Sequence, residues 1–124
     1  GTERLTEGGR MYEYRARIVR VIDGDTVEAE VDLGFHISFL RTLRLFGINT
    51  PETKGVSRPQ GLAARDFLIQ LIDTHTHGNR ELIIRTEKDA TGKYGRLLAT
   101  LIAGGVNLNE ALIAAGHAVV ALYR

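Results

Sequence analysis

The sequence predicts an α+β fold that is mainly β, a small closed barrel of five strands flanked by helices. Three observations predict it. Segments near the N-terminus alternate apolar and polar residues, the middle of the chain repeats apolar residues at helical spacing, and two more strand-like segments precede a second short helix. A chain of 124 residues with 44% hydrophobic content can bury one core of this kind. We therefore expect one domain over residues 12–124.

The first two strands are predicted by a period of two. Residues 12–22 (YEYRARIVRVI) and 26–34 (TVEAEVDLG) both alternate, and the DGD between them predicts a hairpin. A third strand is expected over residues 37–48. Its residues are apolar enough that we expect both of its faces to be covered, although it contains Arg41 and Arg44.

The middle of the chain predicts an amphipathic helix that follows a loop over residues 55–59. Apolar residues recur on one helical face, and Gly78 is expected close to the end of the helix. These face residues are Ala64, Phe67, Leu68, Leu71 and Ile72. We expect this helix to lie on the core.

The last third of the chain predicts two strands, a short helix and a final strand. The strands are expected over residues 81–89, 96–104 and 117–123. Asn107 and Glu110 have the spacing of a helix capping box, so the helix is expected to begin there and to end before Gly116.

Residues 1–11 have no clear period. The opening GTERLTEGGR is polar and contains glycine, so we expect a flexible tail or an expression remnant, with Met11 as a possible native start. No apolar run approaches about 18 residues and no signal peptide is visible, so no membrane partner is expected.

Composition excludes some classes of site. The chain has no cysteine, which excludes a disulfide framework and a thiolate metal site but leaves the compartment open. Its 16 Lys and Arg nearly balance its 15 Asp and Glu, which excludes a binder that relies on bulk basicity. Residues 41–96 hold ten basic and six acidic residues, a net of +4, and the remainder has a net of −3. An anionic partner must therefore be met locally, by the middle of the chain.

The motif IDGDT allows two interpretations. Asp23 and Asp25 are two residues apart, so in an extended chain both carboxylates would point to one side and could share a hard cation. Asp-Gly is also a favoured hairpin turn, which is the commoner explanation of such a triplet.

The stretch RLFGINTPETK combines an arginine with polar residues at the end of a strand. Arg44 lies in an apolar run, where an unpaired guanidinium is costly, so it must meet an anion or a carboxylate. Glu52 follows Pro51, which restricts the loop. A structural ion pair between Arg44 and Glu52 would explain both charges without any functional site.

Two further groups have weaker signals. Lys93, Tyr94 and Arg96 in TGKYGR offer donors and an aromatic face to a nucleotide, although such turns are usually solvated loops. His75 and His77 are two metal-ligand types, but their position near a helix end and the absence of a wider ligand pattern favour an ordinary helix terminus.

In order, the motifs IDGDT, RLFGINTPETK, KYGR and NEALIAAGHA resemble the staphylococcal nuclease family, also called thermonucleases. The resemblance covers residues 12–123 and includes the order Arg44, Glu52, Arg96. It implies an OB-fold barrel and a calcium-dependent phosphodiesterase that acts on DNA and RNA and leaves 3′-phosphates. Separately, we expect the chain to be a monomer.

The resemblance also implies a role for individual residues. Arg44 and Arg96 match the two arginines that clamp the phosphate, and Glu52 matches the proposed general base. Asp25 matches a Ca²⁺-binding carboxylate, and Thr50 matches the residue that offers its backbone carbonyl to the metal.

Other positions match less fully. Lys93 and Tyr94 match groups that touch a terminal phosphate. Asn49 stands where the family usually has a second Ca²⁺-binding aspartate, so we expect weaker Ca²⁺ binding through an amide oxygen. Leu122 stands at the position of a base-stacking tyrosine, with Tyr123 one place later.

The competing functional class is a module that binds nucleic acid or a protein partner without cleavage. Degenerate copies of this kind in the family typically lose the arginines or the glutamate. Arg44, Glu52 and Arg96 are all present here, which favours the enzyme.

Overall fold

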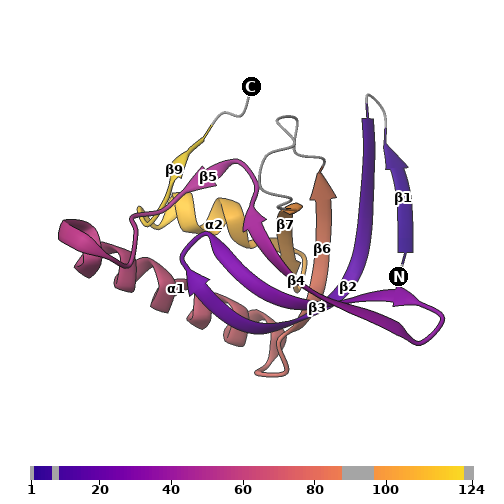
Figure 1. Cartoon of the computed structure of the whole chain (residues 1–124). Helices are drawn as coiled ribbons and strands as arrows, with labels where there is room; N and C mark the ends of the chain where they lie inside the picture. Colours follow the sequence, from indigo (N-terminus) through magenta and orange to yellow (C-terminus); the bar gives the residue numbers. More distant parts are fainter. Residues whose placement is uncertain (1, 7–8, 88–96, 122–124) are drawn as a thin grey trace.

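The structure is a computed structural model that describes residues 2–6, 9–87 and 97–121. Its elements in chain order are β1 (Thr2–Thr6), β2 (Gly9–Asp23), β3 (Thr26–Gly34), β4 (Ile37–Leu45), β5 (Ile48–Asn49), the short 3-10 helix η1 (Gly55–Ser57), α1 (Arg58–Thr76), β6 (Glu81–Glu87), β7 (Leu97–Ala103), β8 (Val106–Asn107), α2 (Leu108–Ala114) and β9 (Val119–Val120). Figure 1 shows the strands curled around one another, with α1 and α2 together on one side of them.

Five strands close into the barrel. β2 pairs antiparallel with β3, β3 with β4, and β6 with β7, while β4 runs parallel to β7. β2 also pairs with β6, which closes the ring. β2 reaches both neighbours because it is long and its register shifts between Ile18 and Arg20 and between Val21 and Asp23, irregularities that bend a strand. The predicted OB-fold class, a five-stranded barrel flanked by helices, is confirmed.

The N-terminal segment contains a strand that sequence periodicity did not indicate. Residues Thr2–Thr6 form β1, which pairs antiparallel with the first part of β2 from Gly9 onward. β1 pairs through its backbone, and backbone hydrogen bonds leave no period in the sequence. The segment expected to be a flexible tail or an expression remnant over residues 1–11 thus includes a paired strand.

The predicted third strand over residues 37–48 divides into two. β4 ends at Leu45, and after a turn in which Gly47 has φ +80°, β5 pairs with β9 in a separate small sheet. The expected cover on both faces is also wrong, because Ile37 and Leu40 are each 56% exposed. This end of the β3–β4 hairpin extends past the barrel wall (Figure 1).

α1 follows the prediction closely at its buried face and its end. The predicted stripe packs inward, with Phe67 and Leu71 partly buried and Ala64, Leu68 and Ile72 fully buried. The helix ends at Thr76, where His77 adopts the left-handed conformation and Gly78 follows. It begins at Arg58 and is preceded by η1, so the loop expected over residues 55–59 is largely helical.

α2 is attached to the barrel by its first turn. Asn107 accepts a hydrogen bond from the Glu110 amide at 3.0 Å, which confirms the predicted N-cap. The buried Asn109 accepts a hydrogen bond from Leu101 N and donates to carbonyls of β7 and of the turn after β4. Gly116 follows the helix with φ +81°, as predicted.

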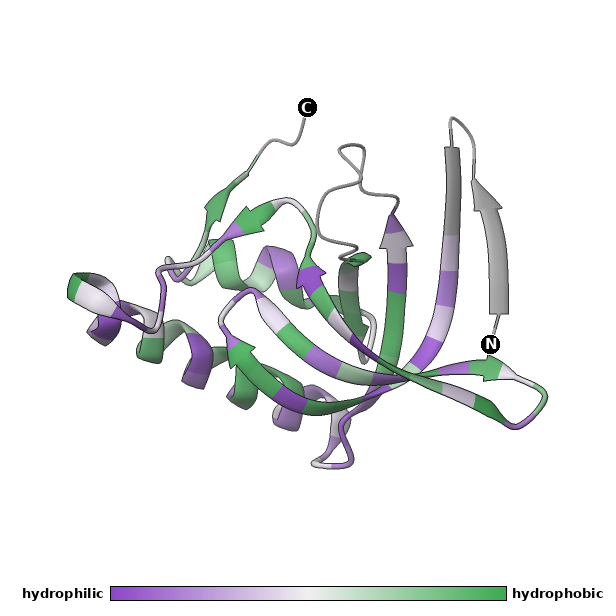
Figure 2. Cartoon of the chain, viewed as in Figure 1, coloured by the Kyte–Doolittle hydropathy of each residue, from purple (hydrophilic) through white to green (hydrophobic). Residues whose placement is uncertain are grey.

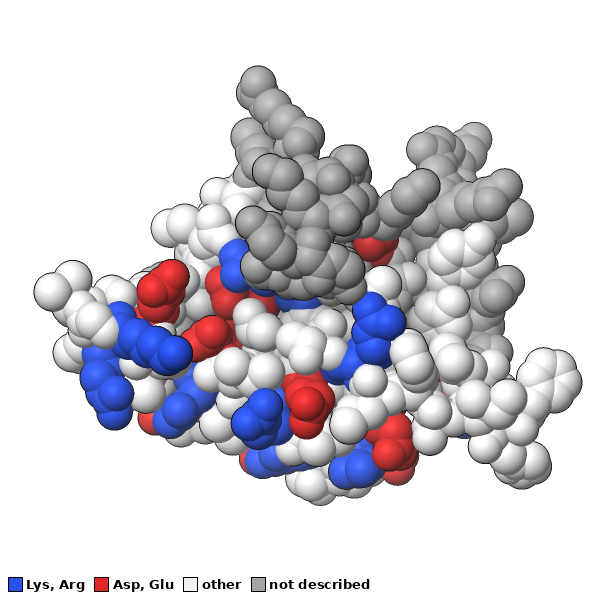
Figure 3. All heavy atoms as spheres, viewed as in Figure 1, with Lys and Arg blue, Asp and Glu red and all other residues white. Residues whose placement is uncertain are grey.

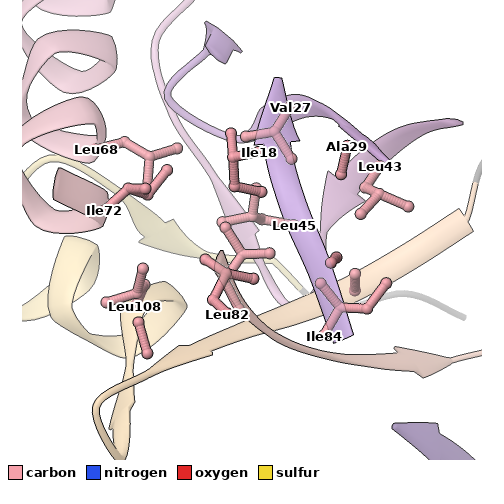
Figure 4. Close-up of a cluster of buried hydrophobic side chains, with 14 of the residues drawn as sticks. Ile18, Val27, Ala29, Leu43, Leu45, Leu68, Ile72, Leu82, Ile84 and Leu108 are labelled. Carbon is pink, nitrogen blue, oxygen red and sulfur yellow. The ribbon is translucent and has the colours of Figure 1, made fainter. Parts of the chain in front are cut away.

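The core fills the barrel and continues under α1 and α2. Figure 2 shows the strand alternation as bands of opposite hydropathy along β3, whose inward residues are buried while Glu30 is exposed. Figure 4 labels side chains of the cluster: Ile18, Val27, Ala29, Leu43, Leu45, Leu68, Ile72, Leu82, Ile84 and Leu108. None of the helices among the described residues has the length and apolar character to cross a membrane.

Candidate functional site

A cavity of about 800 Å³ lies where three segments meet: the β2–β3 turn, the last part of β4 with β5, and the loop that follows β5. It is lined by Asp23, Asp25, Thr26, Thr42, Arg44, Asn49, Thr50, Pro51, Glu52, Thr53 and Lys54. Five predicted site residues therefore gather around one cavity, namely Asp25, Arg44, Asn49, Thr50 and Glu52.

Asp25 is the buried centre of this site. Its carboxylate accepts hydrogen bonds from Thr26 Oγ1 and from Thr50 N, each at 3.0 Å, and lies 3.2 Å from Arg44 Nη2. Only 6% of the Asp25 side chain is exposed. A buried carboxylate is tolerated when it is paired and hydrogen-bonded, and Asp25 meets both conditions.

The two aspartates of IDGDT serve different partners. Asp23 accepts a hydrogen bond from Thr53 Oγ1 at 2.8 Å, whereas Asp25 accepts from Thr50 N. β2 ends at Asp23 and β3 begins at Thr26, its register partner, so the hairpin-turn interpretation is confirmed. Asp25 thus holds the beginning of the loop after β5, at Thr50, and Asp23 holds its middle, at Thr53.

Arg44 meets a carboxylate, but not the one that sequence spacing suggested. In the β3–β4 register Arg44 lies opposite Thr26, next to Asp25, and pairs with Asp25. It also donates to the side-chain oxygen of Asn49 and to Ile48 O. Within the described part of the chain, the alternative ion pair between Arg44 and Glu52 is not formed.

Glu52 is exposed at the rim of the cavity, on the loop after Pro51. Its backbone carbonyl accepts a hydrogen bond from Ser57 Oγ at 3.3 Å. Sequence reasoning missed Ser57 and Thr53, whose hydroxyls hold this loop. Short hydroxyl residues beside a turn were the available signal, because they commonly bond to nearby backbone.

The oxygen atoms around Asp25 are of the kind that Ca²⁺ prefers. Carboxylate, amide and backbone oxygens are offered by Asp25, Asn49 and Thr50. Thr50 Oγ1 is buried and has no hydrogen-bond partner among the described residues. The same residues contain no group of three or more His, Cys, Asp and Glu that could hold a metal.

Several predicted positions lie outside the described residues. Lys93, Tyr94 and Arg96 follow β6 and precede β7, in residues 88–96, and Leu122 and Tyr123 follow residue 121. Their assigned roles stay predictions.

Charges of both signs are interspersed on the face shown in Figure 3, over α1 and the neighbouring strands. This agrees with the near-neutral balance of the chain, +1 at pH 7. Attraction for a polyanion would depend on individual guanidinium groups rather than on a broad positive field.

Comparison with known proteins decides the family. Residues 42–124 match the sequence model described as Staphylococcal nuclease homologue. The chain belongs to the staphylococcal nuclease family. This staphylococcal nuclease homologue is 33% identical over 116 residues to the thermonuclease of Staphylococcus hyicus, an alignment that covers 90% of this chain and 62% of that protein. It is 26% identical over 110 residues to an uncharacterized protein of Bacillus anthracis, covering 86% of this chain and 47% of that protein.

The homologue thus spans about half to two thirds of the length of these relatives. Family membership confirms the resemblance drawn from the motifs and supports a nuclease-like class of function. The matched range begins at Thr42 and includes Arg44 and Glu52 but not Asp25. Asp25 joins the site through the pairing of β3 with β4.

Proposed function

We propose that this chain is a calcium-dependent nuclease that hydrolyses phosphodiester bonds of DNA and RNA and leaves 3′-phosphate products. The observation that carries the proposal is the pairing of Arg44 with the buried Asp25 inside a cavity that Asn49, Thr50 and Glu52 also line. The thermonuclease of Staphylococcus hyicus, at 33% identity, supports the same class of reaction.

Arg44 is suited to bind the phosphate. Its contacts with Asp25, Asn49 and Ile48 all involve Nη2. Nε and Nη1 have no partner in the part of the chain that is described, and 20% of the side chain is exposed. A guanidinium N–H forms a charge-assisted hydrogen bond with a phosphate oxygen, so each of the two remaining nitrogens can donate to a non-bridging oxygen. We propose that Arg96 supplies a second guanidinium and that Lys93 and Tyr94 contact a terminal phosphate.

Glu52 is proposed as the general base. Its side chain is exposed at the cavity, where it can accept a proton from a water molecule. As Glu52 takes the proton, the water oxygen forms a bond to phosphorus and the bond from phosphorus to the 5′ oxygen breaks. The 5′ oxygen takes a proton from solvent and leaves as a hydroxyl, and the phosphate stays on the 3′ side. Negative charge that gathers on the non-bridging oxygens is met by Arg44.

The residues that would hold Ca²⁺ are Asp25, Asn49 and the Thr50 carbonyl. When bound, the ion would act as a Lewis acid toward the phosphoryl oxygens. The Asp25 carboxylate can still offer a lone pair to the ion, because among the described contacts its Oδ1 atom accepts one hydrogen bond, from Thr26. The Asp25 carboxylate is also held in place by Thr50 N and Arg44.

The proposal is tested by incubating the purified chain with single-stranded DNA, duplex DNA and RNA, with Ca²⁺ or with a chelator, followed by gel analysis. We expect fragments with Ca²⁺ only, and 3′ ends that accept extension only after phosphatase treatment. Cleavage that is equal in chelator would contradict the calcium requirement, and intact substrates throughout would contradict the nuclease.

Glu52→Gln is expected to lower the cleavage rate by about 100-fold or more, within the range for removal of a general base. Glu81→Gln is the matched control, because Glu81 is also exposed but does not line this cavity. Initial rates on a labelled oligonucleotide measure both variants. A folded Glu52→Gln protein as fast as Glu81→Gln would remove Glu52 from the mechanism.

A second candidate function is a module that binds nucleic acid or a protein partner without cutting. The observation that favours it is Asn49, which stands where the family usually has a second Ca²⁺-binding aspartate. Retention of an oligonucleotide on a filter, with no cleavage in Ca²⁺, would support this alternative.

Asn49→Asp is expected to tighten Ca²⁺ binding by about tenfold or more, because ligand charge strongly tunes calcium affinity. The new carboxylate can keep the contact that Asn49 makes with Arg44, since it too accepts hydrogen bonds. Isothermal titration with CaCl₂ measures the change. Asn79→Asp, an exposed site outside the cavity, is the control, and equal affinities for the two variants would exclude Asn49 as a ligand.

A further inference from the structure

The loop that carries Glu52 is held from two directions although the Glu52 side chain is exposed. On one side, Thr53 Oγ1 donates to Asp23 and Thr50 N donates to Asp25. On the other side, the Glu52 backbone carbonyl accepts from Ser57 Oγ. The backbone of the proposed general base is therefore fixed, which matters because catalysis is sensitive to small displacements.

Ser57 does not cap the helix that it precedes. It is the N-cap residue of α1, a position where a serine hydroxyl commonly bonds to a backbone amide of the first turn. No such bond is formed by the Ser57 side chain. Its hydroxyl instead lies 3.3 Å from Glu52 O and 3.5 Å from Lys54 O. The hydroxyl thus supports the loop in place of the helix.

Gly61, the fourth residue of α1, leaves the space that the loop occupies. A Cβ atom at Gly61 would lie 2.0 Å from Glu52 O, 2.4 Å from Glu52 C and 2.8 Å from Thr53 N. Ordinary contacts of a Cβ atom are 3.4–4 Å, and the atoms in the way belong to backbone. Glycine costs a helix about 0.5–1 kcal/mol relative to alanine, so α1 gives up intrinsic helix stability to let the loop lie against it.

The same face of α1 also contacts the β2–β3 turn. A Cβ atom at Gly24 would lie 2.8 Å from the Ala64 Cβ and 3.0 Å from Thr50 Oγ1. Gly61 and Ala64 are three residues apart and therefore lie on one face of the helix. α1 thus sets the spacing between the loop with Glu52 and the turn with Asp25.

We infer that Gly61 and Ser57 are positioning residues, which place Glu52 relative to Arg44 and Asp25 for the hydrolytic step. This inference rests on the proposed function of Glu52. Neither residue lines the cavity, so both act through the backbone of the loop.

Gly61→Ala tests the inference. We expect kcat to fall by about 10- to 100-fold, the effect of displacing a reacting group by about 1 Å, with little change in KM for an oligonucleotide. In the Glu52→Gln background the same substitution is expected to cause no further loss, because the group that it displaces no longer acts. Gln60→Ala, an exposed neighbour in the same turn, is the control and is expected to behave as wild type.

Ser57 supplies a second test that does not insert an atom into the helix contact. Ser57→Ala is expected to lower kcat by less than Gly61→Ala does, about 3- to 10-fold, which is the cost of one neutral hydrogen bond. Ser57→Thr keeps the hydroxyl and is expected to restore most of the rate. If Gly61→Ala does not fold, the two Ser57 variants test the inference by themselves. Equal kcat for wild type, Ser57→Ala and Ser57→Thr would overturn it.

Heteronuclear NMR of Gly61→Ala separates this inference from the proposed function. The amide resonances of Glu52 and Thr53 are expected to move far more than those of strands on the opposite side of the barrel, whether or not the chain cleaves nucleic acid. Unmoved resonances, or wild-type kcat in a folded Gly61→Ala protein, would overturn the positioning role. Absence of cleavage by the wild type with moved resonances would reject the nuclease and leave the placement of Glu52 standing.

Discussion

Arg44→Ala will lower the rate of phosphodiester cleavage by about 100- to 1000-fold, the range seen when one donor that stabilises transition-state charge is removed. Arg44 Nη2 is held by Asp25 at 3.2 Å and by Asn49, so the guanidinium is already oriented before substrate binds. Alanine removes both the charge and the N–H donors that would meet the phosphate oxygens. Single-turnover rates on a labelled oligonucleotide in Ca²⁺ measure the loss.

Two further variants separate this effect from a change in fold. Arg44→Lys retains a positive charge beside Asp25 but loses the planar fork of donors, so we expect a folded protein with an intermediate rate. Arg58→Ala removes an exposed arginine at the start of α1, outside the cavity, and should leave the rate unchanged. Arg44→Ala protein that shows a native circular dichroism spectrum and normal turnover would remove the arginine from the mechanism.

Asp25→Ala will be the most destabilising change at the site, by about 3–5 kcal/mol, because it leaves the Arg44 guanidinium without its partly buried counter-charge. Thr50 N and Thr26 Oγ1 lose their acceptor at the same time. Urea unfolding followed by circular dichroism gives the free energy of unfolding. We also expect this variant to lose its response to Ca²⁺.

Asp66→Ala is the matched control for this prediction. Asp66 is exposed and pairs with Arg65 at 3.5 Å on the surface of α1, a class of ion pair that contributes about 0–1 kcal/mol. The urea midpoint of Asp66→Ala should stay close to that of the wild type. If Asp25→Ala unfolds at the same urea concentration as Asp66→Ala, the Asp25 network does not stabilise the fold.

The site was only partly predictable from the order of residues. Arg44 was expected to need a negative partner, which is correct, but the spacing of eight residues suggested Glu52 and the structure supplies Asp25. The difference arises from the β3–β4 register, in which Thr26 lies opposite Arg44 and brings Asp25 beside it. No spacing within RLFGINTPETK contains that information, because it depends on a strand nearly twenty positions earlier.

The sequence by itself determined the parts of this protein that depend on local physics. Period-two alternation predicted the first hairpin, the apolar stripe predicted α1, and the Asn107 cap predicted the start of α2. Each of these features depends on residues that are close to one another in the chain. The ordered motifs identified the family that the match over residues 42–124 confirms.

Only the tertiary structure decided which distant groups meet. It paired β1 with β2, divided the strand expected over residues 37–48, and brought Asp25 to Arg44. It also placed Gly61 against the Glu52 backbone, where a single added carbon would lie 2.0 Å from a carbonyl oxygen. These contacts join segments that are far apart in the chain, and their geometry follows from barrel closure and close packing rather than from any short pattern of residues.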